Sequence, residues 1–531
     1  MARTRFYRTL RRLLRQVSTI QGRPLRSPRL SRRRFLKYSA LAGGAIASAT
    51  LSPRWAVGND APRIAIVGGG LAGLNAAYQL HKQGVMATVY EAKPRVGGRI
   101  HSVTGPVGAG LTVELGAEFI STDHEDLLSL TDEFGIALYS RADEAERSPY
   151  PETAFIYDGK RLTTEELVTA FTPIATQILN DVDRLDEDWA FYAPLLDRLS
   201  VRDYLDLHND RLTEPYVRHF LVSTIRSEYG VEPESSSALQ LLYNLPTATD
   251  DGLNPLGNND EAYTVEGGTE RIITNLRDRL SDQIQRNKRL VQLRAIGEEF
   301  RLTFADASVV VADIVIVAMP FTALRDVQLQ VSLPPDFRQF IIEGNLGLNE
   351  KVIVGMNERH WQQPDGFIGE VWADLGFTRA WDATQRQFNR ADGALTMYLG
   401  GREVDDTEAA PAGILADRFI ERLANYVDGL AAAQSDRAVR TYWYNDYLVK
   451  GSYSTYAPGQ YTDFGAYFYI DSDDPDERQT VSFGSLLFAG EHLSDAYYGY
   501  MNGAAETGRL AAEEVFRQVR PPSPGQAELL R

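Results

Sequence analysis

Residues 63–99 read RIAIVGGGLAGLNAAYQLHKQGVMATVYEAKPRVGGR, and this stretch decides the fold. The apolar run Ile64–Val67 predicts a buried strand, and the periodic pattern from Leu71 to about Gln83 predicts a helix. A second apolar run, Ala87–Tyr90, predicts another strand. Strand, helix and strand in this order indicate the first unit of a parallel α/β sheet.

The turn between the first strand and the helix carries Gly68, Gly70 and Gly73 in G-x-G-x-x-G spacing. The first glycine permits a tight turn, the second lets the backbone approach a pyrophosphate, and the third lets the helix pack on the strand. The helix N-terminus offers unpaired N–H groups to phosphate. Glu91, at the end of the second strand, is placed to bind ribose hydroxyls. The stretch therefore predicts a dinucleotide site, and by itself it fits NAD as well as FAD.

Length and composition set further bounds. The 531 residues are too many for one simple core, so at least two domains are expected. The absence of cysteine excludes disulfides, thiolate metal sites, cysteine nucleophiles and a flavin attached through cysteine. The seven histidines include no H-x-x-x-H pair, so no metal site is expected.

Charge is unevenly distributed along the chain. Residues 1–37 hold 13 basic residues and no acid, and without them 42 basic and 72 acidic residues remain, a net charge of −30. An acidic body keeps a protein soluble and also attracts cationic substrates. Nucleic-acid binding by the body is disfavoured, because phosphate neutralisation needs a basic face.

Residues 1–60 are expected to be a targeting segment and linker. The run SRRRFLK at 31–37 resembles a twin-arginine export signal, and the weakly apolar stretch 38–51 that follows is too short to span a membrane. Export through the twin-arginine machinery would place the protein in the periplasm or outside the cell. A disordered basic arm or a signal anchor is the alternative interpretation.

Two further motifs follow the first. Arg95–Arg99 reads R-V-G-G-R, with two arginines that can reach phosphate oxygens, and Glu114–Ala117 reads E-L-G-A. With the first motif, they resemble the FAD-dependent amine oxidase family, which includes monoamine, polyamine and L-amino-acid oxidases. The resemblance continues to about residue 518.

The resemblance implies an α/β protein of the amine oxidase type, in which a discontinuous Rossmann-like FAD-binding domain is interleaved with an α+β substrate domain. Residues 61–125, 261–330 and 441–518 are assigned to the FAD-binding domain, residues 126–260 and 331–440 to the substrate domain, and residues 519–531 to a loose tail.

The resemblance also implies the catalytic residues. Lys351 has the position of the lysine that holds a water beside the reactive flavin nitrogen. Tyr453 and Tyr500 match the aromatic cage that guides an amine to the flavin, and Trp443 packs near it. Ser452 replaces the cysteine that bonds the flavin in monoamine oxidases, so FAD should be non-covalent.

Glycine motifs and family positions together predict the cofactor site. Val291 would contact the adenine through its backbone, and the N-terminus of the last helix, at the turn Tyr500–Asn502, would stabilise negative charge on the flavin. The residues expected to bind FAD are Gly68, Gly70, Gly73, Glu91, Arg95, Gly98, Arg99, Gly116, Ala117, Val291, Trp443, Gly490, Glu491, Tyr500 and Met501.

Substrate choice is less constrained. Glu118 and Phe119 stand where venom-type L-amino-acid oxidases carry a carboxylate-binding arginine, and another arginine, such as Arg226, could serve instead. With Tyr453 and Tyr500, Glu118 and Phe119 are the predicted substrate contacts. Acids near the predicted cavity (Glu118, Asp123 and Glu228) would suit a second cationic group, as in a polyamine or a basic amino acid such as arginine or lysine.

The sequence therefore predicts an FAD-dependent enzyme that oxidises an amine or a basic L-amino acid to an imine, with electrons passing to oxygen or to a quinone. A homodimer is compatible with this prediction. One alternative is a flavoenzyme of the carotenoid-desaturase type, which would lack the lysine and the tyrosine pair. The other is a non-catalytic flavin-binding protein, whose cavity would be blocked or would lack Lys351.

Overall fold

The computed structural model describes most of the chain after the basic N-terminal segment. The described residues are 61–143, 148–244, 247–249, 252–254, 260–407, 410–472 and 477–519. The predicted export signal and linker and all but the first residue of the predicted tail lie outside them.

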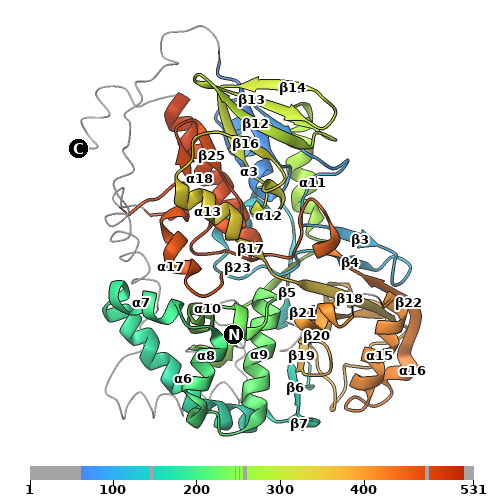
Figure 1. The fold of residues 1–531 in the computed structure, drawn as a ribbon. Helices are drawn as coiled ribbons and strands as arrows, with labels where there is room; N and C mark the ends of the chain where they lie inside the picture. The colour runs from blue at the N-terminus through green and yellow to red at the C-terminus, as the bar shows by residue number, and fades with distance from the viewer. Residues whose placement is uncertain are drawn as a thin grey trace.

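A six-stranded sheet, in the order β11-β2-β1-β15-β25-β24, forms the centre of the upper half of the molecule (Figure 1). β1 (Ile64–Val67) is fully buried and pairs in parallel with β2 (Ala87–Tyr90) and with β15 (Ile314–Val317), which also pairs in parallel with β25 (Leu486–Phe488). The outer strands are β11 (Ile284–Gln285) and β24 (Ser482–Phe483). Three distant parts of the chain thus build one sheet, and the predicted strands 64–67 and 87–90 are confirmed.

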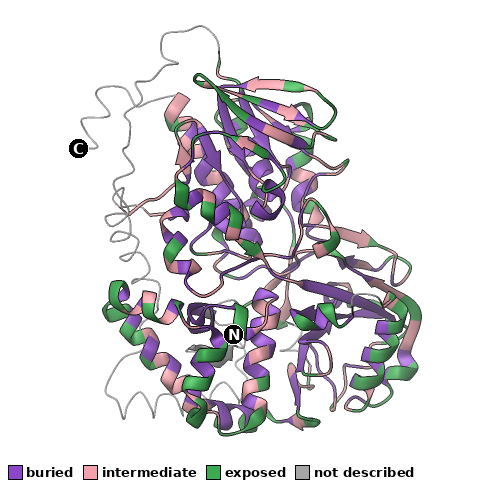
Figure 2. Ribbon diagram, in the orientation of Figure 1, coloured by how far each residue is buried: buried purple, intermediate pink, exposed green. Residues whose placement is uncertain are grey.

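Two helices from opposite ends of the chain pack together beside this sheet. They are α3 (Leu71–Lys82) and α18 (Met501–Val519). A side chain at Gly508 would meet the carbonyl of Ala72 at 2.4 Å, so only glycine allows this approach. The Asn75 amide donates to the Ala505 carbonyl at 2.6 Å. The packing faces are largely buried (Figure 2), and both helix N-termini lie at the same cavity.

A second sheet covers the upper end in the order β14-β13-β12-β16. Its strands are β12 (Leu290–Ile296), β13 (Glu299–Phe304), β14 (Val309–Ala312) and β16 (Gln328–Gln330).

The lower half contains a seven-stranded sheet in the order β22-β18-β21-β20-β19-β6-β7. In register, Lys351 of β18 pairs with Tyr398 of β21, and Tyr398 pairs with Arg379 of β20. Because directly paired residues share a face of a sheet, these three side chains form a row. The strands are β6 (Thr153–Tyr157), β7 (Lys160–Leu162), β18 (Asn349–Met356), β19 (Glu370–Ala373), β20 (Arg379–Asp382), β21 (Gly393–Gly400) and β22 (Gln434–Arg440).

Helices surround this sheet on the outside. Most lie on one side, where α6, α8, α9 and α10 are grouped in Figure 1, and α15 packs against β22 and β18. The helices of this half are α6 (Thr164–Glu187), α7 (Trp189–Asp197), α8 (Val201–Leu207), α9 (Pro215–Tyr229), α10 (Ala238–Asn244), α14 (Arg402–Asp405) and α15 (Ala412–Ala424). Four others lie outside this group: α4 (Glu125–Glu133) packs on α18, α11 (Glu270–Arg279) packs on α3, and α13 (Pro335–Glu343) packs on α17 (Gln460–Phe464). Within the described part of the chain, no helix combines the length and apolar character needed to cross a bilayer.

Candidate active site

One long cavity runs between the two halves of the molecule. Its lining comes from the glycine turn after β1, the E-L-G-A turn, the row on the seven-stranded sheet, and the segments 441–454 and 490–504. Most of the residues predicted to bind cofactor or substrate line it; Gly73, Arg95 and Val291 do not.

The glycine turn forms one part of the cavity wall. Gly68, Gly70 and Gly98 line it together with the first residues of α3, whose N-terminus is capped by no side chain. A Cβ at Gly70 would meet nothing within 4 Å, so it would project into the space a ligand needs. A Cβ at Gly73 would instead meet the Gly68 carbonyl at 2.0 Å, so Gly73 serves the packing of helix on strand. The free N–H groups and the open space suit a pyrophosphate.

Glu91 lies at the end of the cavity next to this turn. Its carboxylate accepts the backbone N–H of Gly69 at 2.7 Å and that of Lys93 at 2.7 Å. Burial raises the pKa of Glu91, and these two hydrogen bonds oppose the rise. Glu91 therefore fixes the shape of the turn and still presents an acceptor to the cavity, as a ribose-binding carboxylate must.

The two arginines of the R-V-G-G-R motif have different roles. Arg95 donates to the carbonyls of Val96, Gly98 and Ile100, so it holds its own loop and does not face the cavity. The prediction that Arg95 binds phosphate is therefore corrected by the structure. Arg99 does line the cavity, and its Nη1 donates to Glu491 at 2.7 Å.

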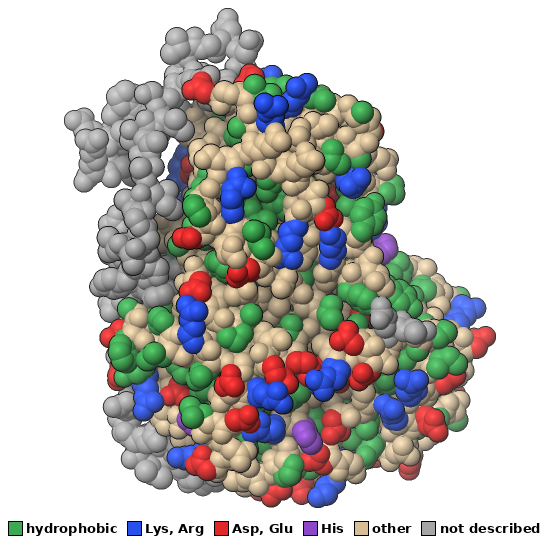
Figure 3. Space-filling view, viewed as in Figure 1, with side chains coloured by type: hydrophobic (Ala, Val, Ile, Leu, Met, Phe, Trp, Pro, Cys, Tyr) green, Lys and Arg blue, Asp and Glu red, His purple; other side chains and the backbone are tan. Residues whose placement is uncertain are grey.

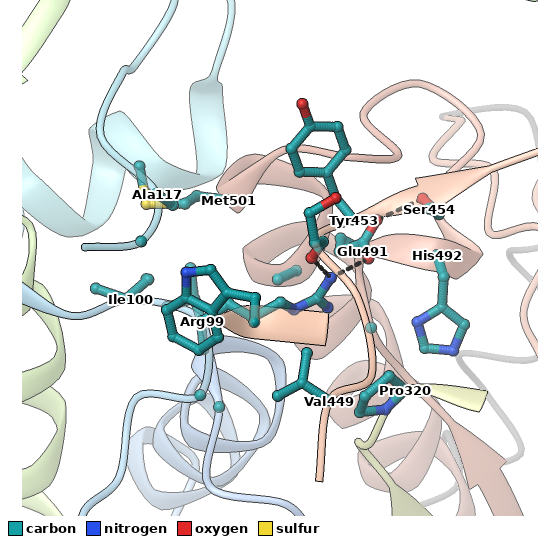
Figure 4. A pocket seen from close by; sticks show the side chains of 18 of the residues that line it. Arg99, Ile100, Ala117, Pro320, Val449, Tyr453, Ser454, Glu491, His492 and Met501 are labelled. Atoms are coloured by element: carbon teal, nitrogen blue, oxygen red, sulfur yellow. Dashed lines mark hydrogen bonds and ion pairs between the residues drawn. The ribbon is translucent and has the colours of Figure 1, made fainter. Parts of the chain in front are cut away.

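The Glu491 carboxylate accepts hydrogen bonds from three donors, one of which is the backbone N–H of Gly499 at 2.7 Å. Figure 4 shows the Arg99 guanidinium directed at the Glu491 carboxylate, which also accepts the Ser454 hydroxyl at 2.6 Å. Burial opposes ionisation of Glu491, but the charge of Arg99, the neighbouring His492 and the hydrogen bonds from Ser454 and Arg99 together outweigh it and lower the pKa of this carboxyl. The pair joins the first motif to the last segment of the chain.

The middle of the cavity is lined by Gly116, Ala117, Trp443, Gly490 and Met501. The Trp443 indole donates to the Leu115 carbonyl at 2.8 Å, which fixes the ring against the E-L-G-A turn. Beside Glu91, whose backbone carbonyl accepts the Lys288 N–H at 2.7 Å, Arg289 and Leu290 line the cavity, and their neighbour Val291 does not. The adenine contact of the Val291 backbone stays a prediction.

Lys351 is buried on the floor of the cavity. Its ammonium group donates to the Glu114 carbonyl at 3.1 Å, the Gly116 carbonyl at 3.0 Å and Oε2 of Glu118 at 2.8 Å. Glu118 was predicted to contact the substrate; in the structure it lines the cavity as the partner of Lys351.

Two tyrosines face the cavity near Lys351. The Tyr453 hydroxyl donates to the Ser227 carbonyl and lies 2.9 Å from the Tyr398 hydroxyl, and the Tyr500 hydroxyl donates to Glu228 at 3.0 Å. Burial raises the pKa of both Tyr453 and Tyr500 well above 10, so both phenols are neutral donors at physiological pH.

A charged wall closes the end of the cavity beyond the tyrosines. Arg379 is 2% exposed, and its Nη2 donates to Glu261 at 2.7 Å while its Nε lies 3.8 Å from Glu370. Arg141 contacts the same two carboxylates at 3.3 and 3.8 Å. Burial lowers the pKa of Arg379, but the charges of Glu261 and Glu370 outweigh it, so the guanidinium stays charged.

Aromatic rings frame this wall. Phe119 lines the cavity, and the guanidinium of Arg141 lies 4.3 Å from its ring centre. Arg379 lies 4.8 Å from the ring centre of Trp381. The predicted position of Phe119 in the substrate end of the cavity is therefore consistent with the structure.

The model of the flavin-containing amine oxidoreductase family matches residues 71–516. The chain belongs to this family. It is 24% identical over 473 residues to pig amine oxidase B, covering 86% of each chain, and 25% identical over 491 residues to a putative flavin-containing monoamine oxidase of Mycobacterium tuberculosis, covering 88% of this chain and 98% of the relative. It is 23% identical to an L-amino-acid oxidase of Pseudechis australis, covering 87% and 88% of the two chains.

Solved structures share the fold of this amine oxidoreductase. Putrescine oxidase bound to putrescine superposes with a TM-score of 0.71 at 22% identity, covering 86% of this chain and 99% of that one. Cyclohexylamine oxidase from Brevibacterium oxydans superposes with a TM-score of 0.73 at 21% identity, covering 87% and 100%. The family and the cavity agree on the cofactor, which is FAD, and the residues lining the glycine turn fit its pyrophosphate.

Two sequence-based suggestions for this amine oxidoreductase do not hold. Arg226 donates two hydrogen bonds to Glu232, each of 2.8 Å. It does not line the cavity, so it cannot bind a substrate carboxylate there. Asp123 is likewise absent from the lining, whereas Glu228 is part of it.

Sequence reasoning missed Arg379, Trp381, Tyr398 and Glu261. A signal was present in the strand 379–382, which reads R-A-W-D, because an arginine alternating with tryptophan is unusual in a buried strand. Nothing comparable marks Glu261, which lies in a loop.

Outside the cavity lining, Asp158, His219 and Asp374 form an exposed group with metal-ligand spacing.

Proposed function

We propose that this amine oxidoreductase deaminates an amine that carries a second cationic group, namely a basic L-amino acid or a polyamine. The charged wall supports this proposal above all. The carboxylates of Glu261 and Glu370 balance the guanidinium groups of Arg141 and Arg379 in the wall. Glu228, which accepts the Tyr500 hydroxyl and is within electrostatic range of Glu261 and Arg379, brings the net charge of the five groups to −1 when all are ionised.

The wall lies at a suitable distance for a second charge. Lys351, Tyr398 and Arg379 occupy neighbouring strands, and neighbouring strands are about 4.8 Å apart. A substrate reacting beside Lys351 would therefore place a group about 10 Å away against the wall. Long polyamines span this distance, and the side chains of arginine and lysine cover most of it, so that a hydrogen bond of about 3 Å to a wall carboxylate closes the remainder.

The residues of the cavity bind and orient the substrate. When bound, FAD accepts a hydride from the carbon that carries the amine. The rings of Tyr453 and Tyr500 restrict the approach of the amine and favour a positive charge over their faces. The hydrogen bonds of their hydroxyl groups to Ser227 and Glu228 hold both rings in place.

Arg379 separates the two substrate classes. Its Nη1 makes no hydrogen bond with any described residue, so it can bind a carboxylate of an amino acid, which a polyamine lacks.

Oxygen or a quinone is the proposed electron acceptor. We also propose export by the twin-arginine route, which the run SRRRFLK at 31–37 supports.

The surface is consistent with a small-molecule substrate. On the face shown in Figure 3, acidic and basic side chains are interspersed over the lower half and form no large basic area of the kind that nucleic acid requires.

The experiment is an anaerobic screen of the purified yellow protein. We expect putrescine, spermidine, agmatine, L-arginine or L-lysine to bleach the flavin faster than benzylamine or L-leucine. Peroxide release, repeated with a quinone, identifies the acceptor. A flavin that stays oxidised with every amine would overturn the proposal, and faster reduction by the monoamines would overturn the requirement for a second cation.

A further inference from the structure

Seven carboxylates line the cavity, and six of them are already engaged. Glu118, Glu261, Asp326, Glu350 and Glu491 each form an ion pair, with Lys351, Arg379, Lys450, Arg440 and Arg99 respectively. Glu91 accepts two backbone N–H groups. Glu228 is the seventh, and among the described residues only the Tyr500 hydroxyl donates to it.

Glu228 lies where the reacting amine must pass. It is in the penultimate position of α9, at residues Pro215–Tyr229, and lines the cavity beside both tyrosines. One carboxylate oxygen accepts Tyr500, and the other makes no hydrogen bond with a described residue. Ser227, its neighbour in sequence, accepts the Tyr453 hydroxyl. The end of α9 thus contacts both members of the tyrosine pair.

The reaction needs a proton acceptor at this place. An alkyl amine is protonated at neutral pH, since its pKa is about 10. The carbon beside it can lose a hydride only when the nitrogen has a free electron pair to form the C=N bond. The other ionisable groups near the amine are unsuitable: Lys351 is an ammonium donating to three oxygens, and burial lowers the pKa of the lining His492 to about 4.

We propose that Glu228 takes this proton from the substrate ammonium group as the amine binds between the tyrosines. An N–H bond of the ammonium breaks, its electron pair stays on nitrogen, and an O–H bond forms on the free oxygen of Glu228. This step is a proton transfer, and no group is oxidised or reduced in it. Hydride loss from carbon then leaves an iminium ion, which water hydrolyses. The inference rests on the proposed amine oxidation and identifies the residue that prepares the substrate for it.

The surroundings of Glu228 suit a proton acceptor. Burial, aided by the charge of Glu261, raises the pKa of Glu228 to about 7, while Arg379 and the Tyr500 hydroxyl oppose the rise. A carboxyl with this pKa is ionised above about pH 7, and its proton affinity is closer to that of an amine than that of an ordinary carboxyl with a pKa near 4.5. The titratable and charged groups that interact with Glu228 are Tyr229 of its own helix and, from neighbouring elements, Glu261, Glu370, Arg379, Tyr398, Tyr453 and Tyr500.

The test compares wild type with Glu228→Gln by anaerobic stopped flow. The probe is agmatine, which has one titratable amine and a permanent guanidinium, or L-arginine if the screen selects amino acids. The measured quantity is the rate constant of flavin reduction divided by Kd, from pH 6 to 10. In wild type it should reach a plateau above about pH 7. The reacting pair is free amine with protonated Glu228, and above this pH the fraction of free amine rises as fast as the fraction of protonated Glu228 falls.

In Glu228→Gln the same quantity should keep rising to the pKa of the amine, since only free amine reacts. The ratio of variant to wild type should therefore rise about tenfold per pH unit above pH 7, whatever its value at pH 7. A merely structural role of Glu228 would leave the two profiles parallel. The matched control is Glu403→Gln, because Glu403 is also buried with a pKa raised to about 8 but does not line the cavity. Its ratio should not change with pH.

An infrared difference spectrum of the chemically reduced holoenzyme, with and without the same amine at pH 9, gives a readout without turnover. Wild type and Glu403→Gln should gain a protonated-carboxyl band that Glu228→Gln lacks. Parallel profiles, or a changing ratio without the band, would overturn the inference while amine oxidation stands. Failure of every amine to reduce wild type would overturn the proposed function and the inference with it.

Discussion

Lys351 and Glu118 form an ion pair on the floor of the cavity, with 2.8 Å between Nζ and Oε2 and side chains that are 8% and 4% exposed. The Glu114 and Gly116 carbonyls accept from the same ammonium group. The E-L-G-A turn therefore supplies the acceptors that hold Lys351 in place, which connects two motifs more than 200 residues apart.

Removing one member of this pair should destabilise the fold. Lys351→Met leaves the Glu118 carboxylate buried without a cation, and the expected loss in the free energy of unfolding is about 3 kcal/mol. Adding Glu118→Gln to the same variant should recover most of this loss. Urea unfolding of the FAD-bound proteins measures both values. Equal stability of the single and double variants would contradict a direct interaction.

Lys351→Met should also slow flavin reduction or reoxidation by orders of magnitude while FAD stays bound. The reason is the loss of the positive charge at the floor of the cavity near the tyrosine pair. Stopped-flow absorbance resolves the two half-reactions. Lys82→Met, which removes a surface lysine paired with Glu133, is the control and should leave both rates unchanged. Normal turnover in Lys351→Met would remove this residue from the mechanism.

Glu91→Ala should weaken FAD binding at least about tenfold, because it removes the ribose acceptor and leaves two backbone N–H groups without a partner. Glu91→Gln keeps one acceptor and should fall between wild type and alanine. Flavin content after dialysis, followed by absorbance, measures the order of the three proteins. Full FAD retention by Glu91→Ala would show that the ribose assignment is wrong.

The raised pKa of Glu228 predicts a pH-dependent cost in stability. The folded protein holds this proton up to about pH 7, and the unfolded chain loses it near 4.5. Folding is therefore disfavoured increasingly as pH rises from 4.5 to 7, by about 3 kcal/mol in full. Glu228→Gln should be more stable than wild type at pH 8 and no more stable at pH 4. Thermal unfolding at both values tests the sign.

Glu261→Gln should reduce selectivity for dications. The substitution removes the negative charge closest to Arg379 and brings the net charge of the wall and Glu228 together to zero. We expect kcat/KM to fall about tenfold or more for putrescine or L-arginine and much less for benzylamine. Asp326→Asn, in the other half of the cavity, is the control for a general change of cavity charge. An equal fall for all amines would contradict a specific role of the wall.

The features predicted from the sequence are those encoded locally. The G-x-G-x-x-G turn, the strands around it and Glu91 are set by neighbouring residues, and the structure has them as expected. Lys351 was found by its resemblance to a family position, because nothing in the strand NEKVIV distinguishes a cavity lysine from a surface one.

What sequence reasoning could not give depends on contacts between distant segments. Arg379 and Glu261 meet only because a strand and a loop 118 residues apart converge. Arg95 looks like a phosphate ligand by its motif, but carbonyls of its own loop lie within its reach. Arg226 likewise forms two hydrogen bonds with Glu232, six residues away, so its guanidinium is not available to a substrate.

The packing of α3 against α18 has a consequence for biosynthesis. The two helix N-termini at the cavity begin at residues 71 and 501, so a ribosome has made almost the whole polypeptide before the second one exists. The complete FAD site can therefore form only when translation is nearly finished. A chain that ends before Gly490 lacks the part of the cavity lining that includes Glu491, Tyr500 and Met501. Such a chain should hold FAD less tightly than the full-length protein, so flavin content distinguishes the two.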